Sequence, residues 1–249
     1  MDFAEAAKQV LGDDLVSVVL FGSWARGQAD GWSDRDVFLI IAHEPGEETL
    51  LELALAAPPR LQFQCHTPEQ LLTAIRNLRA PQMAMVDEGV VIYGAGLEPY
   101  RAALAEVVAQ HGLVRRPELG KGVWEAGDRF PPREALAKLR EVRQALASAR
   151  ALLGEGHEAR SLLACQVAVE KLLGACLAVK FCGRLLLPRP SLLALLEDKV
   201  LGQGSDVAGV LDIFQAHDAI EGLRIAEEGL EFTRRFLERR YELGVFQMS

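Results

Sequence analysis

The chain has 249 residues, of which half are hydrophobic and a quarter are charged, so it can bury a sizeable core and wholesale disorder is excluded. Its formal net charge of −8 argues against a broad surface for DNA or RNA, which would normally be basic. The four cysteines form no CxxC pair, the first residues lack the basic region of a signal peptide, and no run of 18 apolar residues occurs. These features predict a cytoplasmic protein with reduced thiols, no zinc site and no membrane span.

Charge and composition divide the chain into two parts. Residues 1–113 hold 7 Lys and Arg against 16 Asp and Glu, whereas the remainder is nearly neutral and is rich in Leu, Ala, Glu and Arg. Between the two parts, residues 114–132 combine Gly, Pro and charge with weak periodicity, which is typical of a connection. We therefore expect one domain over 1–113, a linker over 114–132 and a second domain over 133–249.

Helical and strand-like runs alternate through the first domain. Apolar spacing predicts helices over 2–11, 47–56, 68–78, a short stretch from 81, and 97–110. Apolar, β-branched runs predict strands over 15–21, 36–42, 61–66 and 89–93. Thr67 and Pro68 are a typical helix start, with Thr67 as the N-cap. This order predicts a small α/β domain.

One segment of this domain, LFGSWARGQADGWSDRDVFLI (20–40), combines four features with a chemical use. A buried strand ends in Gly22-Ser23, where a glycine lets the backbone approach a phosphate and a following helix offers N–H groups to an anion. After a polar loop, Asp34 and Asp36 are two residues apart at the start of the next strand, so both point to one face. Paired carboxylates repel unless a cation lies between them, and Mg²⁺ prefers one or two carboxylates plus substrate phosphates. The segment predicts a site for phosphoryl or nucleotidyl transfer.

The same segment resembles the signature of the minimal nucleotidyltransferases of the DNA polymerase β superfamily, which runs Gly-Ser-x-Ala-Arg-Gly, a spacer and Ser-Asp-x-Asp. The resemblance extends to about residue 110 and implies an α/β nucleotidyltransferase fold with a small mixed sheet and helices. It implies that Gly22 and Ser23 hold the triphosphate of a nucleoside triphosphate. Asp34 and Asp36 would bind Mg²⁺ or Mn²⁺. Arg26 would contact phosphate or pair with one of the two aspartates.

The sequence departs from the family pattern at the third acid. This acid would lie on strand 61–66, LQFQCH, whose site-facing residues are Gln62, Gln64 and His66. Counting back from Thr67 puts Gln62 at the acid position, with Gln64 as the alternative. A glutamine can offer a neutral oxygen but cannot take a proton, so a general base worth about 10²–10⁴-fold is missing. Two outcomes stay open: slow transfer, with His66 as a substitute base, or nucleotide binding without turnover.

The second domain has the pattern of an all-α bundle of four to five helices. Amphipathic periodicity predicts helices over 133–153, 157–181, 191–201 and 207–241, with Ser191 as an N-cap and a break near His217. The stretches 166–180 and 219–240 resemble helices of HEPN domains, which are often fused to minimal nucleotidyltransferases. The Arg-x4–6-His nuclease motif of some HEPN domains fits only Arg150 and His157, across a Gly-Glu-Gly loop, so we expect no nuclease site there. The bundle would then bind the acceptor, cover the nucleotide or mediate a homodimer.

Together these patterns predict a Mg²⁺-dependent nucleotidyltransferase that moves a nucleoside monophosphate to a hydroxyl of a small molecule or a protein. A weakened, non-catalytic nucleotide sensor is the alternative, as is a toxin–antitoxin-type module with a HEPN bundle that binds a partner. The base and the acceptor stay open.

Overall fold

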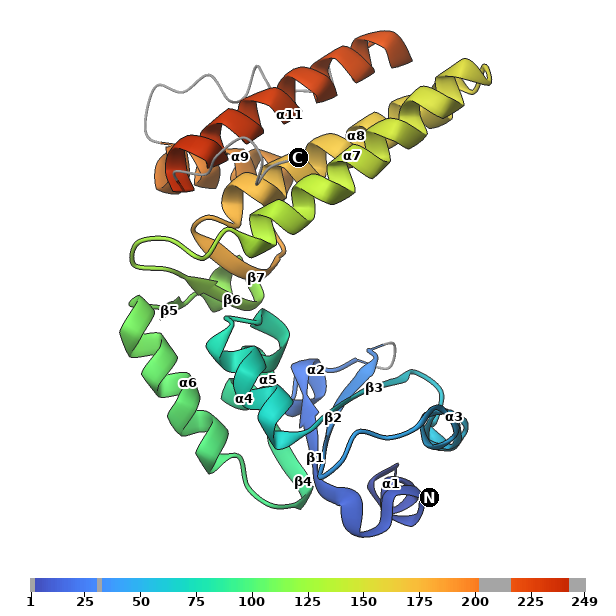
Figure 1. The fold of residues 1–249 in the computed structure, drawn as a ribbon, viewed down its shortest axis with the longest axis vertical. Helices are drawn as coiled ribbons and strands as arrows, with labels where there is room; N and C mark the ends of the chain where they lie inside the picture. The colour runs from blue at the N-terminus through green and yellow to red at the C-terminus, as the bar shows by residue number, and fades with distance from the viewer. Residues whose placement is uncertain (1–2, 31–32, 202–215, 242–249) are drawn as a thin grey trace. The chain divides into compact units, whose positions relative to one another are not determined.

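The protein is described here from a computed structural model, in which residues 3–30, 33–201 and 216–241 are described. The chain divides into two compact units (Figure 1). The first unit comprises residues 1–127 together with 182–186, and the second comprises 128–181 together with 187–249. Within the described part of the chain, no helix is both long and apolar enough to cross a membrane.

A four-stranded mixed sheet forms the centre of the first unit, as the sequence predicts. Its strands are β1 (Leu15–Phe21), β2 (Arg35–Ile41), β3 (Leu61–His66) and β4 (Val90–Gly94), in the order β3-β2-β1-β4. Strand β1 pairs antiparallel with both β2 and β4, whereas β2 and β3 run parallel. Because β2 and β3 are parallel, their N-terminal ends meet at one edge of the sheet, next to the end of β1.

Helices cover both faces of this sheet (Figure 1). On one face, α1 (Phe3–Leu11) and α3 (Glu47–Ala56) bury Phe3, Ala7 and Leu53 against apolar residues of β1 and β2. On the other side lie α4 (Pro68–Arg76), α5 (Ala80–Glu88) and α6 (Glu98–His111). The observed bounds of α3 and β3 equal the predicted ones. Thr67 is the N-cap of α4, as expected, and it also forms a full capping box with Gln70.

The segment predicted as a linker, 114–132, contains strands. It forms β5 (Val114–Arg115), a 3₁₀ turn (Pro117–Leu119) and β6 (Gly120–Glu125), which join β7 (Phe181–Leu185) in the order β5-β6-β7. Strand β7 begins at the last residue of the predicted helix 157–181 and lies in the domain predicted to be an all-α bundle. Backbones approach closely here, because a Cβ on Gly183 would lie 2.3 Å from the carbonyl oxygen of Gly122. These short, glycine-containing strands show little periodicity, and their pairing partner is distant in sequence, so local patterns miss them.

The second unit is built mainly from helices α7 (Arg133–Gly154), α8 (Glu158–Leu177), α9 (Arg189–Leu196) and α11 (Ala219–Tyr241). A single π-helical turn, Glu197–Leu201, continues α9. Helices α7 and α8 form a hairpin, and α11 packs along α8 (Figure 1). The contact faces are apolar and include Val142, Leu146, Leu172 and Leu237. The part of the predicted helix 207–241 that precedes residue 216 lies outside the described residues, and the expected HEPN-like bundle stays a prediction.

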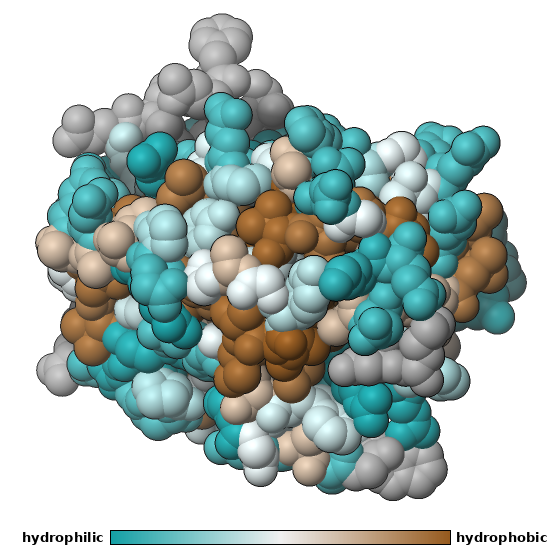
Figure 2. Space-filling view, turned by 90° about the horizontal axis from the view of Figure 1, so that it is seen from below, coloured by the Kyte–Doolittle hydropathy of each residue, from teal (hydrophilic) through white to brown (hydrophobic). Residues whose placement is uncertain are grey.

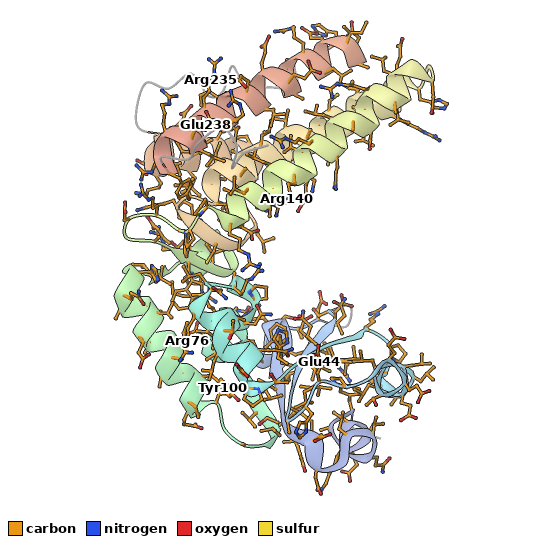
Figure 3. All side chains as sticks on the ribbon, viewed as in Figure 1. Glu44, Arg76, Tyr100, Arg140, Arg235 and Glu238 are labelled. Carbon is orange, nitrogen blue, oxygen red and sulfur yellow. The ribbon has the colours of Figure 1, made fainter. Side chains whose placement is uncertain are left out.

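The exposed face of α11 carries a ladder of ion pairs spaced three and four residues apart. Arg234 pairs with Glu231 and Glu238, and Arg235 pairs with Glu231; Arg235 and Glu238 are labelled in Figure 3. The two guanidinium groups lower the pKa of Glu231 to about 2. Ion pairs on a helix surface contribute little to stability, so the helix depends mainly on its buried face.

The first unit also exposes apolar side chains. Leu51 and Leu55 of α3 and Ile92 of β4 are among its large exposed hydrophobic residues. Figure 2 shows the molecule from below, with brown apolar patches lying among teal polar side chains. Scattered apolar exposure of this kind is ordinary for a folded domain.

Candidate functional site

The turn that follows β1 brings its backbone against Asp36. Gly22 has a φ of 73° and begins α2 (Gly22–Ala25), a single helical turn. A Cβ on Gly22 would lie only 2.7 Å from Oδ2 of Asp36, so a side chain here would displace that carboxylate. Glycine therefore serves two needs at this position, a left-handed backbone and a close approach to Asp36.

Asp36 lies at the meeting point of three strands. Its Cα is the register partner of Phe21 at the end of β1 and of Gln62 near the start of β3. Asp34 precedes β2 and is exposed, and Asp36 is half-buried. The turn residues Gly22 and Ser23 and the two aspartates thus lie at one edge of the sheet, and their binding roles stay a prediction.

Strand β3 places the three substitutes for the missing acid at different distances from the aspartates. Gln62 is in register with Asp36, Gln64 with Phe38, and His66 with Ile40. The amide nitrogen of Gln62 donates to Oδ2 of Asp34 at 3.4 Å. His66 is four residues further along the strand, or about 13 Å. The register therefore favours Gln62 over Gln64 and His66 as the third member of the site.

The imidazole of His66 is packed rather than presented to the aspartates. Its ring centroid lies 4.9 Å from that of Phe38, and its Nε2 lies 3.3 Å from the amide nitrogen of Gln82 on α5. Burial lowers the pKa of His66 from its ordinary value of 6.5. The half-buried imidazole of His66 thus lies between Phe38 of β2 and Gln82 of α5.

This environment predicts a pH dependence of stability. Because the folded state lowers the pKa of His66, the unfolded chain binds more protons below about pH 6.5, and the free energy of unfolding should fall as the pH decreases. Urea titrations at pH 5 and pH 7.5 measure this difference. It should shrink in His66→Gln, and an unchanged difference in that variant would contradict the assignment.

Arg26 is held by an acidic residue of α5. Its Nη1 forms an ion pair with Glu88, and its Nε donates to Oε1 of Gln28 at 3.0 Å. The predicted contact of Arg26 with phosphate stays a prediction. No sequence pattern singled out Glu88, which lies 62 residues along the chain from Arg26.

The loop between α2 and β2 is closed by Trp24. The indole nitrogen of Trp24 donates to the carbonyl oxygen of Ser33 at 3.3 Å. The guanidinium carbon of Arg35 lies 4.5 Å from the centroid of the Trp24 ring, a cation–π contact. Since Ser33 and Arg35 flank Asp34, Trp24 contacts the residues on both sides of that carboxylate.

The donor set is compatible with a small divalent cation. Asp34 and Asp36 would supply carboxylate oxygens, whereas Gln62 directs its amide nitrogen at Asp34. Among the described residues, no group of three or more His, Cys, Asp and Glu side chains is placed to hold a metal ion. Mg²⁺ is commonly bound by one or two carboxylates and completes its shell with water and substrate phosphates. These residues therefore fit Mg²⁺ or Mn²⁺ bound together with a nucleotide.

The N-terminal part of the chain is similar to known nucleotidyltransferases. Residues 1–67 match the family described as nucleotidyltransferase domain. A putative protein adenylyltransferase of Methanocaldococcus jannaschii is 48% identical over 44 residues. That alignment covers 18% of this chain and 30% of the relative, so this chain spans under a third of the curated relative it matches.

Solved structures resemble the chain only distantly. A nucleotidyltransferase-like protein from Exiguobacterium sibiricum is 11% identical, with 96% of this chain and 76% of that one covered and a TM-score of 0.44. A spectinomycin adenyltransferase of Enterococcus faecialis is 8% identical, covers 91% and 96%, and has a TM-score of 0.33. These TM-scores are too low to assign the fold of the whole chain. The family match and the 44-residue alignment show instead that the N-terminal part of this chain is similar to nucleotidyltransferase domains.

Proposed function

We propose that the protein is a nucleotidyltransferase that uses Mg²⁺ or Mn²⁺ to move a nucleoside monophosphate from a nucleoside triphosphate to a hydroxyl of a small molecule or a protein. The observation that carries the proposal is the close approach of the Gly22 backbone to Asp36, with Asp34 beside it. One edge of the sheet holds both a turn whose N–H groups can donate to phosphate oxygens and a pair of carboxylates that can bind a cation. The match of residues 1–67 to nucleotidyltransferase domains supports the same chemistry.

The roles of the residues follow from their chemistry. The Ser23 hydroxyl and the backbone N–H groups of the turn donate to the triphosphate, and Asp34 and Asp36 hold the cation. When bound, the cation neutralises charge on the phosphates and on the leaving group. The acceptor oxygen forms a bond to the α-phosphorus as the bond to pyrophosphate breaks. Gln62 cannot take the acceptor's proton, which then passes to water, so turnover should be slow.

Product formation with labelled nucleotides tests the proposal. Purified full-length chain is incubated with α-labelled ATP, GTP, CTP or UTP, with Mg²⁺ or Mn²⁺, and with candidate hydroxyl acceptors or alone. Release of pyrophosphate together with label on an acceptor or on the chain itself would support transfer. If no nucleotide, metal or acceptor gives either product, the proposal fails.

Restoring a carboxylate on β3 should raise the activity. Gln62→Glu places a third acid in register with Asp36, where it can accept a proton and bind the cation. We expect the transfer rate to rise about 10²-fold, at the lower end of what general bases contribute. Gln64→Glu is the matched control. It adds the same charge to the same strand two residues further along, where the register partner is Phe38. Equal effects of the two variants on rate and on Mn²⁺ affinity would contradict this role of Gln62.

A second function is favoured by the hydrogen bond between Gln62 and Asp34. If this amide holds the Asp34 carboxylate in place of a base, the domain binds a nucleotide without turning it over, and the two units act as a sensor or a partner-binding module. Toxin–antitoxin modules with a HEPN bundle are the corresponding class. Calorimetry and the pyrophosphate assay together separate the alternatives. A sensor binds a triphosphate in the calorimeter but releases no pyrophosphate. Failure to bind any nucleotide would exclude both.

A further inference from the structure

Three arginines converge on the last turn of α5. Glu88 pairs with Arg26 after α2 and with Arg115 of β5, and Asp87 accepts from Nε of Arg115 at 3.1 Å. Arg101 of α6 donates to the carbonyl oxygens of Val86 at 3.4 Å and Gly89 at 3.2 Å. Cations at this position also compensate the negative end of the helix dipole. The turn is therefore a junction between α2, α5, α6 and β5.

Glu88 is the bridging member of this junction. Its side chain is only 17% exposed, and its two carboxylate oxygens are divided between Arg26 and Arg115. Arg115 is itself fixed by two contacts. Its Nη1 donates to the carbonyl oxygen of Val123 at 3.0 Å, and its guanidinium carbon lies 5.3 Å from the centroid of the Trp124 ring. A carboxylate with two such partners is held in one place, and removing its charge takes the Glu88 partner from the partly buried guanidinium groups of Arg26 and Arg115, of which Arg115 keeps its pair with Asp87.

Helix α2 depends on contacts of this kind. It is one turn of four residues, far too short to be stable by itself. Arg26 ends it, and the Arg26 N–H donates back to the carbonyl oxygen of Gly22 at 3.3 Å. The ion pair between Arg26 and Glu88 therefore fixes the C-terminal end of the turn that begins at Gly22 and Ser23.

We propose that Glu88 is a positioning residue for the nucleotide: held by Arg115, it fixes Arg26 and, through Arg26, the Gly22–Ser23 turn that receives the triphosphate. This inference rests on the proposed function, because it concerns the conformation of the same turn that would bind the triphosphate. It also links the turn to the three-stranded sheet of the same unit, since Arg115 belongs to β5.

The test compares Glu88→Gln with Glu125→Gln. Glu125 is a matched control: it also pairs with an arginine, Arg116, its side chain is 15% exposed, and it lies on β6 of the same unit. Two readouts are measured on the full chain. The first is the affinity for Mg²⁺–AMP-PNP by calorimetry, and the second is amide hydrogen exchange over residues 22–26 without nucleotide.

We expect Glu88→Gln to weaken binding of Mg²⁺–AMP-PNP about tenfold, the worth of one misplaced charged hydrogen bond, and to speed exchange over residues 22–26. Arg115→Met should change both readouts in the same direction, and Glu88→Asp, which keeps the charge, should restore part of the affinity. Glu125→Gln should change neither readout, although it also removes an ion pair.

The outcomes separate this inference from the proposed function. If the wild type binds AMP-PNP and both glutamine variants bind it equally well or equally poorly, the positioning role is refuted and the proposed function stands. If the wild type binds no nucleotide, the proposed function is refuted and the positioning of a nucleotide falls with it, whereas the exchange comparison still shows whether Glu88 fixes the Gly22–Ser23 turn. Equal exchange over residues 22–26 in Glu88→Gln and Glu125→Gln would overturn it.

Discussion

Asp36→Asn is expected to lower the rate of nucleotide transfer about 10³-fold while the protein stays folded, because losing one preorganised electrostatic group at a developing charge costs about 10²–10³ and the cation is also bound less tightly. Asp36 is the register partner of both Phe21 and Gln62, neither of which carries a carboxylate. The amide is nearly isosteric with the carboxylate, which keeps steric effects small. Pyrophosphate release at saturating nucleotide and Mn²⁺ measures the rate.

Asp14→Asn is the control for this substitution. It makes the same chemical change on an exposed aspartate whose carboxylate accepts from Nδ1 of His43 at 2.8 Å, away from the Gly22 turn. Its rate should equal that of the wild type. If Asp36→Asn retained more than about a tenth of the wild-type rate, far above the expectation for an essential carboxylate, the metal-binding role would be wrong.

Gly22→Ala is expected to reduce transfer about 10²-fold, because its Cβ would displace the Asp36 carboxylate from the position 2.7 Å away, and a misplacement of about 1 Å can cost that much. Because the backbone at this position is left-handed, a Cβ should also lower the free energy of unfolding by about 1–2 kcal/mol. Urea denaturation measures the stability, and initial rates of pyrophosphate release measure the activity.

Gly27→Ala separates the two effects. Gly27 also has a positive φ, 66°, but a Cβ there meets no atom within 4 Å. We expect it to lose a similar free energy of unfolding, about 1–2 kcal/mol, with a rate close to that of the wild type. Equal losses of activity in both variants would show that backbone strain in the loop, and not the contact with Asp36, limits the reaction.

Local sequence patterns predicted most of the first sheet. The runs at 15–21 and 61–66 matched β1 and β3 residue for residue, because alternating or continuous apolar runs bounded by Gly, Pro and capping residues have few other structures. The predicted strand 36–42 and the observed β2, Arg35–Ile41, differ by one residue at each end. Counting back from Thr67 puts Gln62 at the family's acid position, with Gln64 as the alternative, and the parallel register pairs Gln62 with Asp36.

Such patterns did not predict the second sheet, β5-β6-β7. Strand β5 has two residues and β6 begins Gly-Lys-Gly, so neither has the length or periodicity that identifies a strand. Their stability comes from pairing with β7, which lies more than fifty residues further along the chain. Non-local pairing of this kind is decided by the whole chain and leaves little trace in any short segment.

The sequence by itself determined the chemistry of the candidate site: a glycine-serine turn, two aspartates at strand spacing and an amide where an acid was expected. Only the tertiary structure decided which groups act together. It separated Gln62, in register with Asp36, from His66 further along the strand, and it joined Arg26 to Glu88 and Arg115. The physical reason is that residue type and local spacing set what a side chain can do, whereas strand register and ion pairing between distant segments set what it meets.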